Sequence, residues 1–371
     1  MKVEFYKHNL GVEEQQKVLE CLSGIFLTTG QYVKDFENRF AQYLGLKNVV
    51  GLTSCTAALH LSLLALDIGP GDEVITTPMT FIATANAILY VGAKPVFVDV
   101  EPQTGLIDPL LIEAAITSRT KAIIPVHLYG QMCDMKAISK IAHKYNLKLI
   151  EDCAHCVEGV RDGVRPGQLS DAACYSFYAT KNLTCGEGGA VACNDDSLAQ
   201  RLMTLRQHGM SKSAADRYTG AYQHWDMTEL GWKYNMSNIQ AALLIPQIDR
   251  IEERWQKRDL LYKLYRHHIN KISYLNAPKI VDGVKSAYHL FTIKVPADQR
   301  DALLGRLNSN DIGCAVNYRA VHLLTFYKDE FGYKLNTFPK AEQFGFETIS
   351  LPFWIGLAES QVEHVARILN A

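Results

Sequence analysis

The sequence of 371 residues lacks several features that would place it in a broad class at once. No apolar run reaches the roughly 18 residues that a membrane-spanning helix needs, so we expect no membrane partner. The first residues, Met1–His8, lack the apolar core of a signal peptide, and we expect a cytoplasmic protein. The formal net charge is only -1, which gives no electrostatic basis for binding nucleic acid.

The sequence also lacks the cysteine pattern of a disulfide scaffold or a zinc module. It holds nine cysteines, an odd number, and they are scattered through apparent core strands. This usage is typical of reduced, buried thiols. Cys153-Ala-His-Cys156 resembles half of a zinc clip, but no second Cys/His pair completes it. We therefore expect no metal.

What the sequence does contain is a regular alternation of apolar strands and helices over its first two thirds. Such alternation predicts an α/β fold, in which a mostly parallel sheet lies between two helical layers. The segments 172–178 and 189–193 suggest an antiparallel insertion around the loop that joins them. The expected strands are 48–52, 73–76, 94–100, 121–127 and 147–152, and the expected helices are 12–22, 32–44, 57–66, 80–91 and 135–144.

The pattern changes near residue 250. A long charged helix at 248–268 is followed by a strand at 288–295, a helix at 299–308 and a short strand at 313–317. This order is typical of a smaller α+β domain with an antiparallel sheet. We therefore divide the chain into a large domain, residues 1–247, and a small C-terminal domain, residues 248–371.

The most informative stretch is 175–189. It places Lys181 among apolar and small residues, just before Gly186-Glu-Gly-Gly189. A buried lysine is costly unless it is neutral, paired or covalently engaged. Upstream, Asp152 ends an apolar strand, where the ligand crevice of a parallel sheet lies. This pair matches the needs of pyridoxal 5'-phosphate (PLP), with a lysine for the Schiff base and an aspartate for the pyridine nitrogen. Taken singly, Lys181 could be a surface lysine, and Asp152 a helix cap or half of a salt bridge.

Other residues around these two could complete a cofactor site. Ser54 and Thr56 open a helix, where unpaired backbone N–H groups favour an anion such as phosphate, although a plain N-cap explains them as well. Ser176 precedes Lys181 by five residues and could reach the same phosphate. Phe81 could stack on a flat ring, and His155 could bind it, although both could equally be core side chains.

Together these segments resemble one family, the PLP-dependent nucleotide-sugar aminotransferases of the DegT/DnrJ/EryC1/StrS type, whose fold is that of aspartate aminotransferase (PLP fold type I). The resemblance extends over nearly the whole chain. The segments that carry it are Phe26-Leu-Thr-Thr-Gly30, Thr53-Ser-Cys-Thr-Ala-Ala-Leu59, Gly69-Pro-Gly-Asp-Glu-Val-Ile75, Ile123-Ile-Pro-Val-His127, Glu151-Asp-Cys-Ala-His155, Ser176-Phe-Tyr-Ala-Thr-Lys-Asn182, Gly186-Glu-Gly-Gly189, Tyr234-Asn-Met-Ser237, Val321-His322, Phe338-Pro-Lys-Ala-Glu342 and Ser350-Leu-Pro352.

The resemblance implies a role for each candidate residue. Lys181 forms the Schiff base and moves the proton, and Asp152 pairs with the ring nitrogen. His155 lies near the ring oxygen. The further cofactor contacts are Phe81 on the ring and Ser54, Thr56, Ala57 and Ser176 around the phosphate, with Asn235 reaching the phosphate across a homodimer interface. Thr29, Tyr318 and His322 fall in segments that border the sugar pocket in the family.

The implied reaction is transamination of a nucleotide-linked keto sugar, a 4-keto-6-deoxy hexose or hexosamine, with L-glutamate as donor and 2-oxoglutarate as by-product. The amino sugar would enter surface glycan or lipopolysaccharide synthesis. A 3-keto sugar and a PLP-dependent lyase or dehydratase remain alternatives. One branch of the family dehydrates and has histidine in place of the lysine, and the presence of Lys181 favours transamination.

Two further readings are open. An amino-acid aminotransferase of this fold usually clamps its substrate carboxylate with an arginine of the small domain. Arg319 is the one candidate nearby, and a sugar needs no such clamp. A PLP-binding regulator would normally carry a DNA-binding segment, for which a chain of this length leaves no room.

Overall fold

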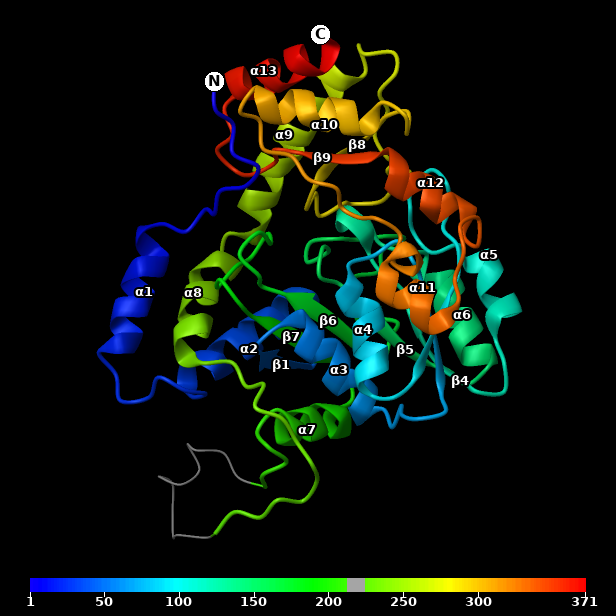
Figure 1. Cartoon of the computed structure of the whole chain (residues 1–371). Helices are drawn as coiled ribbons and strands as arrows, with labels where there is room; N and C mark the ends of the chain where they lie inside the picture. The colour runs from blue at the N-terminus through cyan, green and yellow to red at the C-terminus, as the bar shows by residue number, and fades with distance from the viewer. Residues whose placement is uncertain (212–223) are drawn as a thin grey trace.

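The computed structural model describes residues 1–211 and 224–371, and its centre is a seven-stranded sheet (Figure 1). The strand order is β1-β7-β6-β5-β4-β2-β3, and neighbouring strands are parallel except for β7, which is antiparallel to both β1 and β6. The strands are β1 (Asn48–Leu52), β2 (Glu73–Thr76), β3 (Lys94–Phe97), β4 (Thr120–Ile124), β5 (Lys148–Asp152), β6 (Ala172–Ser176) and β7 (Gly189–Cys193).

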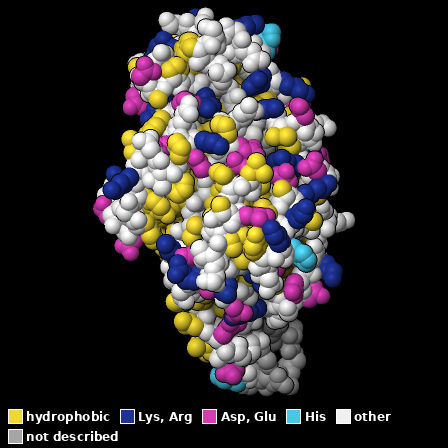
Figure 2. Space-filling model, turned by 90° about the vertical axis from the view of Figure 1, so that its right-hand side faces the viewer, with side chains coloured by type: hydrophobic (Ala, Val, Ile, Leu, Met, Phe, Trp, Pro, Cys, Tyr) yellow, Lys and Arg dark blue, Asp and Glu magenta, His cyan; other side chains and the backbone are white. Residues whose placement is uncertain are grey.

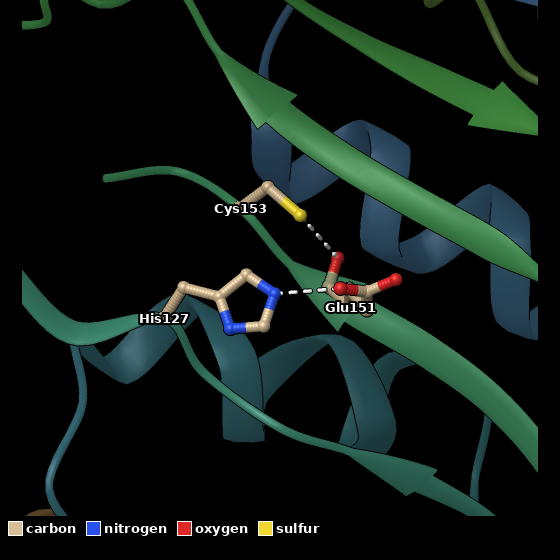
Figure 3. Close-up of side chains that lie close together, drawn as sticks. All are labelled: His127, Glu151 and Cys153. Carbon is tan, nitrogen blue, oxygen red and sulfur yellow. Dashed lines mark hydrogen bonds and ion pairs between the residues drawn. The ribbon is translucent and has the colours of Figure 1, made fainter. Parts of the chain in front are cut away.

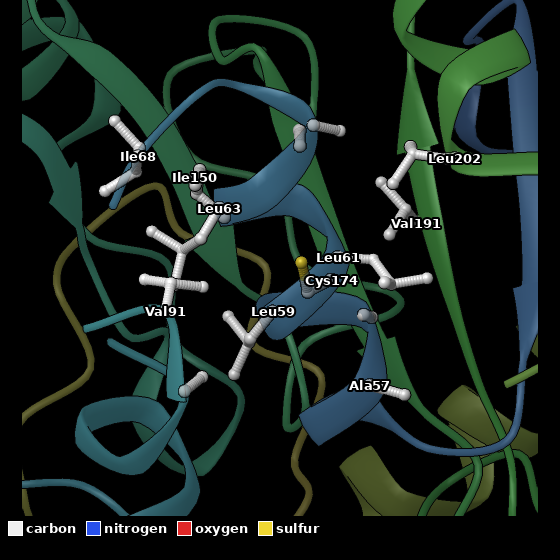
Figure 4. Close-up of a cluster of buried hydrophobic side chains, with 14 of the residues drawn as sticks. Ala57, Leu59, Leu61, Leu63, Ile68, Val91, Ile150, Cys174, Val191 and Leu202 are labelled. Atoms are coloured by element: carbon white, nitrogen blue, oxygen red, sulfur yellow. The ribbon is translucent and has the colours of Figure 1, made fainter. Parts of the chain in front are cut away.

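Helices cover both faces of this sheet, which explains why most residues of the central strands are buried instead of alternating between buried and exposed. Along β6, Cys174 packs on one side with α3 and α7, and Tyr175 packs on the other with α2 and α8. Figure 4 shows the first cluster, where the α3 side chains Leu59, Leu61 and Leu63 lie among residues of the sheet, α7 and Val91. The helices of this part are α1 (Val12–Leu22), α2 (Gln31–Leu44), α3 (Cys55–Ala65), α4 (Ile82–Tyr90), α5 (Pro109–Ile112), α6 (Met135–Lys144), α7 (Asp196–Leu205) and α8 (Asn238–Ile248).

A second, smaller unit lies above the sheet in Figure 1, near both ends of the chain. Its two strands, β8 (Phe291–Lys294) and β9 (Thr348–Leu351), are antiparallel. They share a core with α9 (Ile251–Ile269), α10 (Arg300–Ser309) and α13 (Glu359–Asn370). Val3 belongs to this core, whereas Phe344 of α12 (Pro339–Glu347) packs with the core beside α6. The short α11 (Thr325–Phe331) completes the described helices.

Three details of the sequence-based fold are wrong. First, β6 and β7 are antiparallel to each other as expected, but they form no insertion, because β6 pairs in parallel with β5 and both strands belong to the main sheet. Second, residues 313–317 form no strand and contribute one bridge, between Ala315 and Ser350. Third, the partner of β8 is β9, which the sequence reading assigned to no strand. Its four buried residues are too few to show a periodic pattern.

Two expectations about composition can be compared with the structure. All nine cysteines are free, and eight of them are buried. Among the described residues, no helix combines the length and the apolar character needed to cross a membrane. On the face drawn in Figure 2, side chains of both charge signs are interspersed, and neither sign forms a continuous patch.

Candidate active site

A cavity of about 550 Å³ lies at the carboxyl ends of the parallel strands. The sheet register explains why several candidates meet there. Gly189 at the start of β7 pairs with Leu52 at the end of β1 and with Ser176 at the end of β6. Asp152 ends the neighbouring strand β5. The residues that line the cavity include Ser54, Thr56, Phe81, Asp152, His155, Ser176, Lys181, His289, Asn317 and Tyr318.

Lys181 lies in the loop between β6 and β7, and its side chain faces this cavity. Its amine lies 3.5 Å from Nε2 of His289. Burial lowers the pKa of Lys181 from 10.5 to about 8, and nearby Cys55 and Asp152 offset only part of that effect. Near neutral pH the unprotonated fraction of this amine is therefore much larger than that of an ordinary lysine, and the unprotonated form is the one that acts as a nucleophile or base.

Asp152 is held firmly in one orientation at the end of β5. One carboxylate oxygen accepts a hydrogen bond from Thr84 Oγ1 at 2.7 Å, and the other accepts one from the N–H of Ala154 at 3.1 Å. Thr84 is itself bonded to Thr80 at 2.7 Å. Asp152 is 6% exposed, so its carboxylate is nearly buried in the cavity wall.

Behind Asp152, three potential metal ligands come together, namely His127, Glu151 and Cys153 (Figure 3). Their donor atoms are already engaged. His127 Nε2 contacts one Glu151 oxygen at 2.6 Å, and the other oxygen accepts bonds from Gly167 N–H and Ser170 Oγ. Burial raises the pKa of the Cys153 thiol well above its usual value, so a metal-binding thiolate is disfavoured. Through its hydrogen bonds the cluster links the segment that follows β4 to the end of β5.

His155 and Tyr318 form a directed hydrogen-bond chain in the cavity wall. Nδ1 of His155 accepts the N–H of Tyr129 at 3.2 Å. Burial and the nearby Lys181 lower the pKa of His155 well below 6.5, so the ring is neutral and its proton is on Nε2. This nitrogen then donates to Tyr318 Oη at 3.1 Å. The Tyr318 hydroxyl is left with its own hydrogen to donate to a ligand.

The region where β1, β6 and β7 end fits a phosphate. Gly189 leaves room for the start of α3, since a Cβ there would come within 2.3 Å of the Ser54 carbonyl carbon. Ser54 Oγ accepts a hydrogen bond from the N–H of Ala57 at 3.0 Å, so Ser54 is the N-cap of α3. The sequence had indicated this role as an alternative to phosphate binding. Thr56 and Ser176 line the cavity with hydroxyl groups, and Ser176 Oγ makes one long contact, to the N–H of Tyr178 at 3.4 Å. The donors and the helix N-terminus suit an anionic group.

Not every candidate lies at this cavity. Phe81 does, with its ring half exposed and 5.7 Å from that of Tyr318. Asn235 and Thr29 bond to each other at 2.7 Å outside the cavity lining. The structure also does not bring His322 to the cavity, because its imidazole is fully buried against Glu342 at 3.0 Å.

The sequence reading missed several residues that the structure places at the site. His289 and Asn317 line the cavity, and Thr84 orients Asp152. His289 falls just before β8, where a histidine at the head of an apolar strand was a weak signal. Thr84 lies in the first turn of α4, where nothing in the spacing distinguishes it from a core residue.

A lysine amine with a lowered pKa that faces a fixed carboxylate across a cavity, beside an anion site at a helix start, is the arrangement that a PLP-dependent enzyme needs. The comparisons with known proteins agree. The model of the DegT/DnrJ/EryC1/StrS aminotransferase family matches residues 8–370. The chain belongs to this family, and it is a PLP-dependent sugar aminotransferase.

Three relatives show how close this likeness is. Spore coat polysaccharide biosynthesis protein SpsC of Bacillus subtilis is 40% identical, and the match covers 96% of this chain and 93% of SpsC. Spr1654 of Streptococcus pneumoniae in its PMP form has a TM-score of 0.94 at 29% identity, covering 100% of this chain and 98% of that chain, and a PLP form is similar. PseC of Helicobacter pylori, an aminotransferase involved in the biosynthesis of pseudoaminic acid, has a TM-score of 0.92 at 28% identity over 100% of this chain and 98% of that chain.

The lowered pKa of Lys181 can be measured directly in the cofactor-free protein. We expect competitive labelling with acetic anhydride, followed by mass spectrometry of the Lys181 peptide, to give a titration midpoint near pH 8. Exposed lysines in the same digest, such as Lys257, provide the reference for labelling of a side chain in water. A Lys181 midpoint close to 10.5 would contradict the dry environment of the amine.

Proposed function

We propose that this enzyme transfers the amino group of L-glutamate to a nucleotide-linked keto sugar, a 4-keto-6-deoxy hexose or hexosamine. The product is an amino sugar for surface glycan or lipopolysaccharide synthesis. The observation that carries the proposal is the composition of the cavity wall. Among the described residues, no arginine lines the cavity, and Arg319 is an exposed residue outside it. Amino-acid aminotransferases of this fold usually bind the substrate carboxylate with an arginine of the small domain.

The residues of the cavity divide the work of transamination among them. When bound, PLP supplies an electron sink for the carbon that loses its proton. Lys181, as a neutral amine, takes that proton and later returns it to the new position. Asp152, fixed by Thr84 and Ala154, would keep the ring nitrogen of the cofactor protonated. Ser54, Thr56, Ala57 and Ser176 would hold the phosphate, and Phe81 and His155 would border the ring.

The Tyr318 hydroxyl has the right polarity to bind the acceptor. Because His155 donates to its oxygen, the tyrosine hydrogen is free to point to a carbonyl or hydroxyl oxygen of the sugar. Burial raises the pKa of Tyr318 well above its ordinary value, so the group remains a donor at any working pH. The proposal also assigns Thr29 and His322 to the border of the sugar pocket, outside the cavity lining of their own chain.

We also propose a homodimer in which Asn235 acts on the partner's cofactor. In its own chain Asn235 lies away from the cavity, and its buried Oδ1 has no hydrogen-bond partner. The segment beside it carries two exposed apolar side chains, Ile25 and Leu27, which are 94% and 44% exposed. Covering such side chains with a second copy removes them from water.

Mixed dimers test this arrangement. We expect Lys181→Ala and Asn235→Asp chains to be weakly active or inactive alone. Unfolded and refolded together at equal amounts, they should recover about a quarter of wild-type activity, because half of the dimers are mixed and each mixed dimer has one intact site. Asn235 acting within its own chain would give no recovery, and an active monomer in sedimentation velocity would refute the dimer itself.

The substrate is tested by a single-turnover experiment. The pyridoxamine form of the enzyme is mixed with UDP-, dTDP- and GDP-linked 4-keto and 3-keto sugars, and return of the PLP absorbance identifies the acceptor. We expect a 4-keto nucleotide sugar to react, and 3-keto sugars are the matched comparison. Reaction with 2-keto acids alone would overturn the proposal in favour of an amino-acid aminotransferase. L-glutamate and other amino acids, mixed with the PLP form, test the donor in the same way.

A further inference from the structure

His289 lines the cavity, but the reaction proposed above gives it no role. His289 precedes β8 and therefore comes from the smaller unit, opposite the loop that carries Lys181. It is 6% exposed and lines the cavity, and its Nε2 lies 3.5 Å from the Lys181 amine. Its ring also lies against that of His155, with centroids 4.4 Å apart.

The charge state of His289 follows from the groups that face it. Arg258 and, in its protonated form, the Lys181 amine place positive charge beside His289, and the neutral ring of His155 lies against it. Arg258, from α9, forms an ion pair with Glu158, so it needs no further anionic partner. Burial, Lys181 and Arg258 together lower the pKa of His289 well below 6.5, so the imidazole is neutral.

The tautomer follows from the other ring nitrogen. Nδ1 of His289 is buried and has no hydrogen-bond partner among the described residues. A proton on Nδ1 would therefore be a buried donor without an acceptor, which is the rarer and costlier kind of unpaired group. With the proton on Nε2 instead, the ring can donate to the lone pair of an unprotonated Lys181 amine.

We propose that His289 is a positioning residue that holds the free amine of Lys181 in its unprotonated form and directs it into the cavity. This inference rests on the proposed function, in which Lys181 must be a base after it is released from the cofactor. Cys55 and Asp152, which also face Lys181, both favour the protonated amine. Burial and the hydrogen bond from His289 both favour the unprotonated amine, and so both oppose the effect of Cys55 and Asp152.

The test is the pH profile of Lys181 labelling in the cofactor-free protein. In His289→Leu the amine stays out of water but loses its donor, so we expect the midpoint to rise by about one pH unit. His289→Gln places an amide N–H near the former Nε2 and should restore the wild-type midpoint. The control is His60→Leu, since His60 is equally buried at 5% exposure and does not line the cavity.

Each outcome decides the question. A His289→Leu midpoint equal to or below that of wild type overturns the proposal, because burial alone then accounts for the lowered pKa. A raised midpoint that glutamine does not restore overturns it as well. If the leucine variant does not fold, His289→Asn replaces it, since its shorter amide does not reach Lys181. Turnover of the wild-type holoenzyme with keto sugars, measured on the same preparation, shows separately whether the proposed function holds.

Discussion

Lys181→Ala is expected to abolish transamination, with a loss of roughly 10⁴-fold or more in kcat. The variant lacks both the amine that bonds to the cofactor and the base that moves the proton. We also expect the absorbance of the lysine-bound cofactor to disappear, even where PLP still binds through the phosphate contacts. The fold should persist, because removing a side chain that faces a cavity leaves the packed core intact.

Lys257→Ala is the matched control, since this lysine is 53% exposed in an ion pair with Glu253 on α9. Exposed pairs of this kind contribute little to stability, so activity and melting temperature should match wild type. Small primary amines added to Lys181→Ala should restore part of the activity by replacing the missing base. A Lys181→Ala protein that kept both the lysine-bound absorbance and full turnover would falsify the assignment of this residue.

Asp152→Asn is expected to lower kcat by roughly 10²- to 10³-fold while leaving the structure in place. The amide oxygen can still accept from Ala154 N–H, and the amide N–H₂ can donate to Thr84 Oγ1, which is free to turn toward Thr80. The substitution therefore removes the negative charge without leaving a buried group unpaired. What is lost is the ability to keep a proton on the ring nitrogen of the cofactor.

Thr84→Val separates the charge of Asp152 from its orientation. This variant keeps the carboxylate and removes one of its two hydrogen bonds, and we expect a loss of about fivefold to tenfold. Steady-state kinetics and the cofactor absorbance spectrum measure both variants side by side. An Asp152→Asn enzyme no slower than Thr84→Val would show that the carboxylate acts through its hydrogen bonds and not through its charge.

Local signals predicted much of the main sheet and its helices. The expected bounds of α1, β2 and α6 agree with the structure residue for residue. Each of these segments has its own periodicity or composition, and burial in the tertiary structure reinforces it. The prediction failed where pairing with a distant strand decides the structure. Residues 313–317 were expected to form a strand, yet the segment makes only the bridge between Ala315 and Ser350 of β9, and β9 is the strand that pairs with β8.

The candidate site shows the same division. Lys181 and Asp152 were recognisable because a lysine among apolar residues and an aspartate at the end of an apolar strand are locally unusual. His289 lies 108 residues from Lys181 in the chain, and only folding places the two nitrogens 3.5 Å apart. The burial of His322 against Glu342 is likewise a tertiary result, and no feature of the segment Val321-His322 indicated it.

The sequence by itself determined the alternation of strands and helices, the lysine and aspartate, and the membership of an aminotransferase family. These follow from short-range patterns, since period, capping and composition act within a few turns of the chain. Only the tertiary structure decided which side chains share the cavity and in which protonation state they do so. The physical reason is that desolvation and hydrogen-bond direction depend on the atoms packed around a group, and those atoms come from parts of the chain that no local pattern connects.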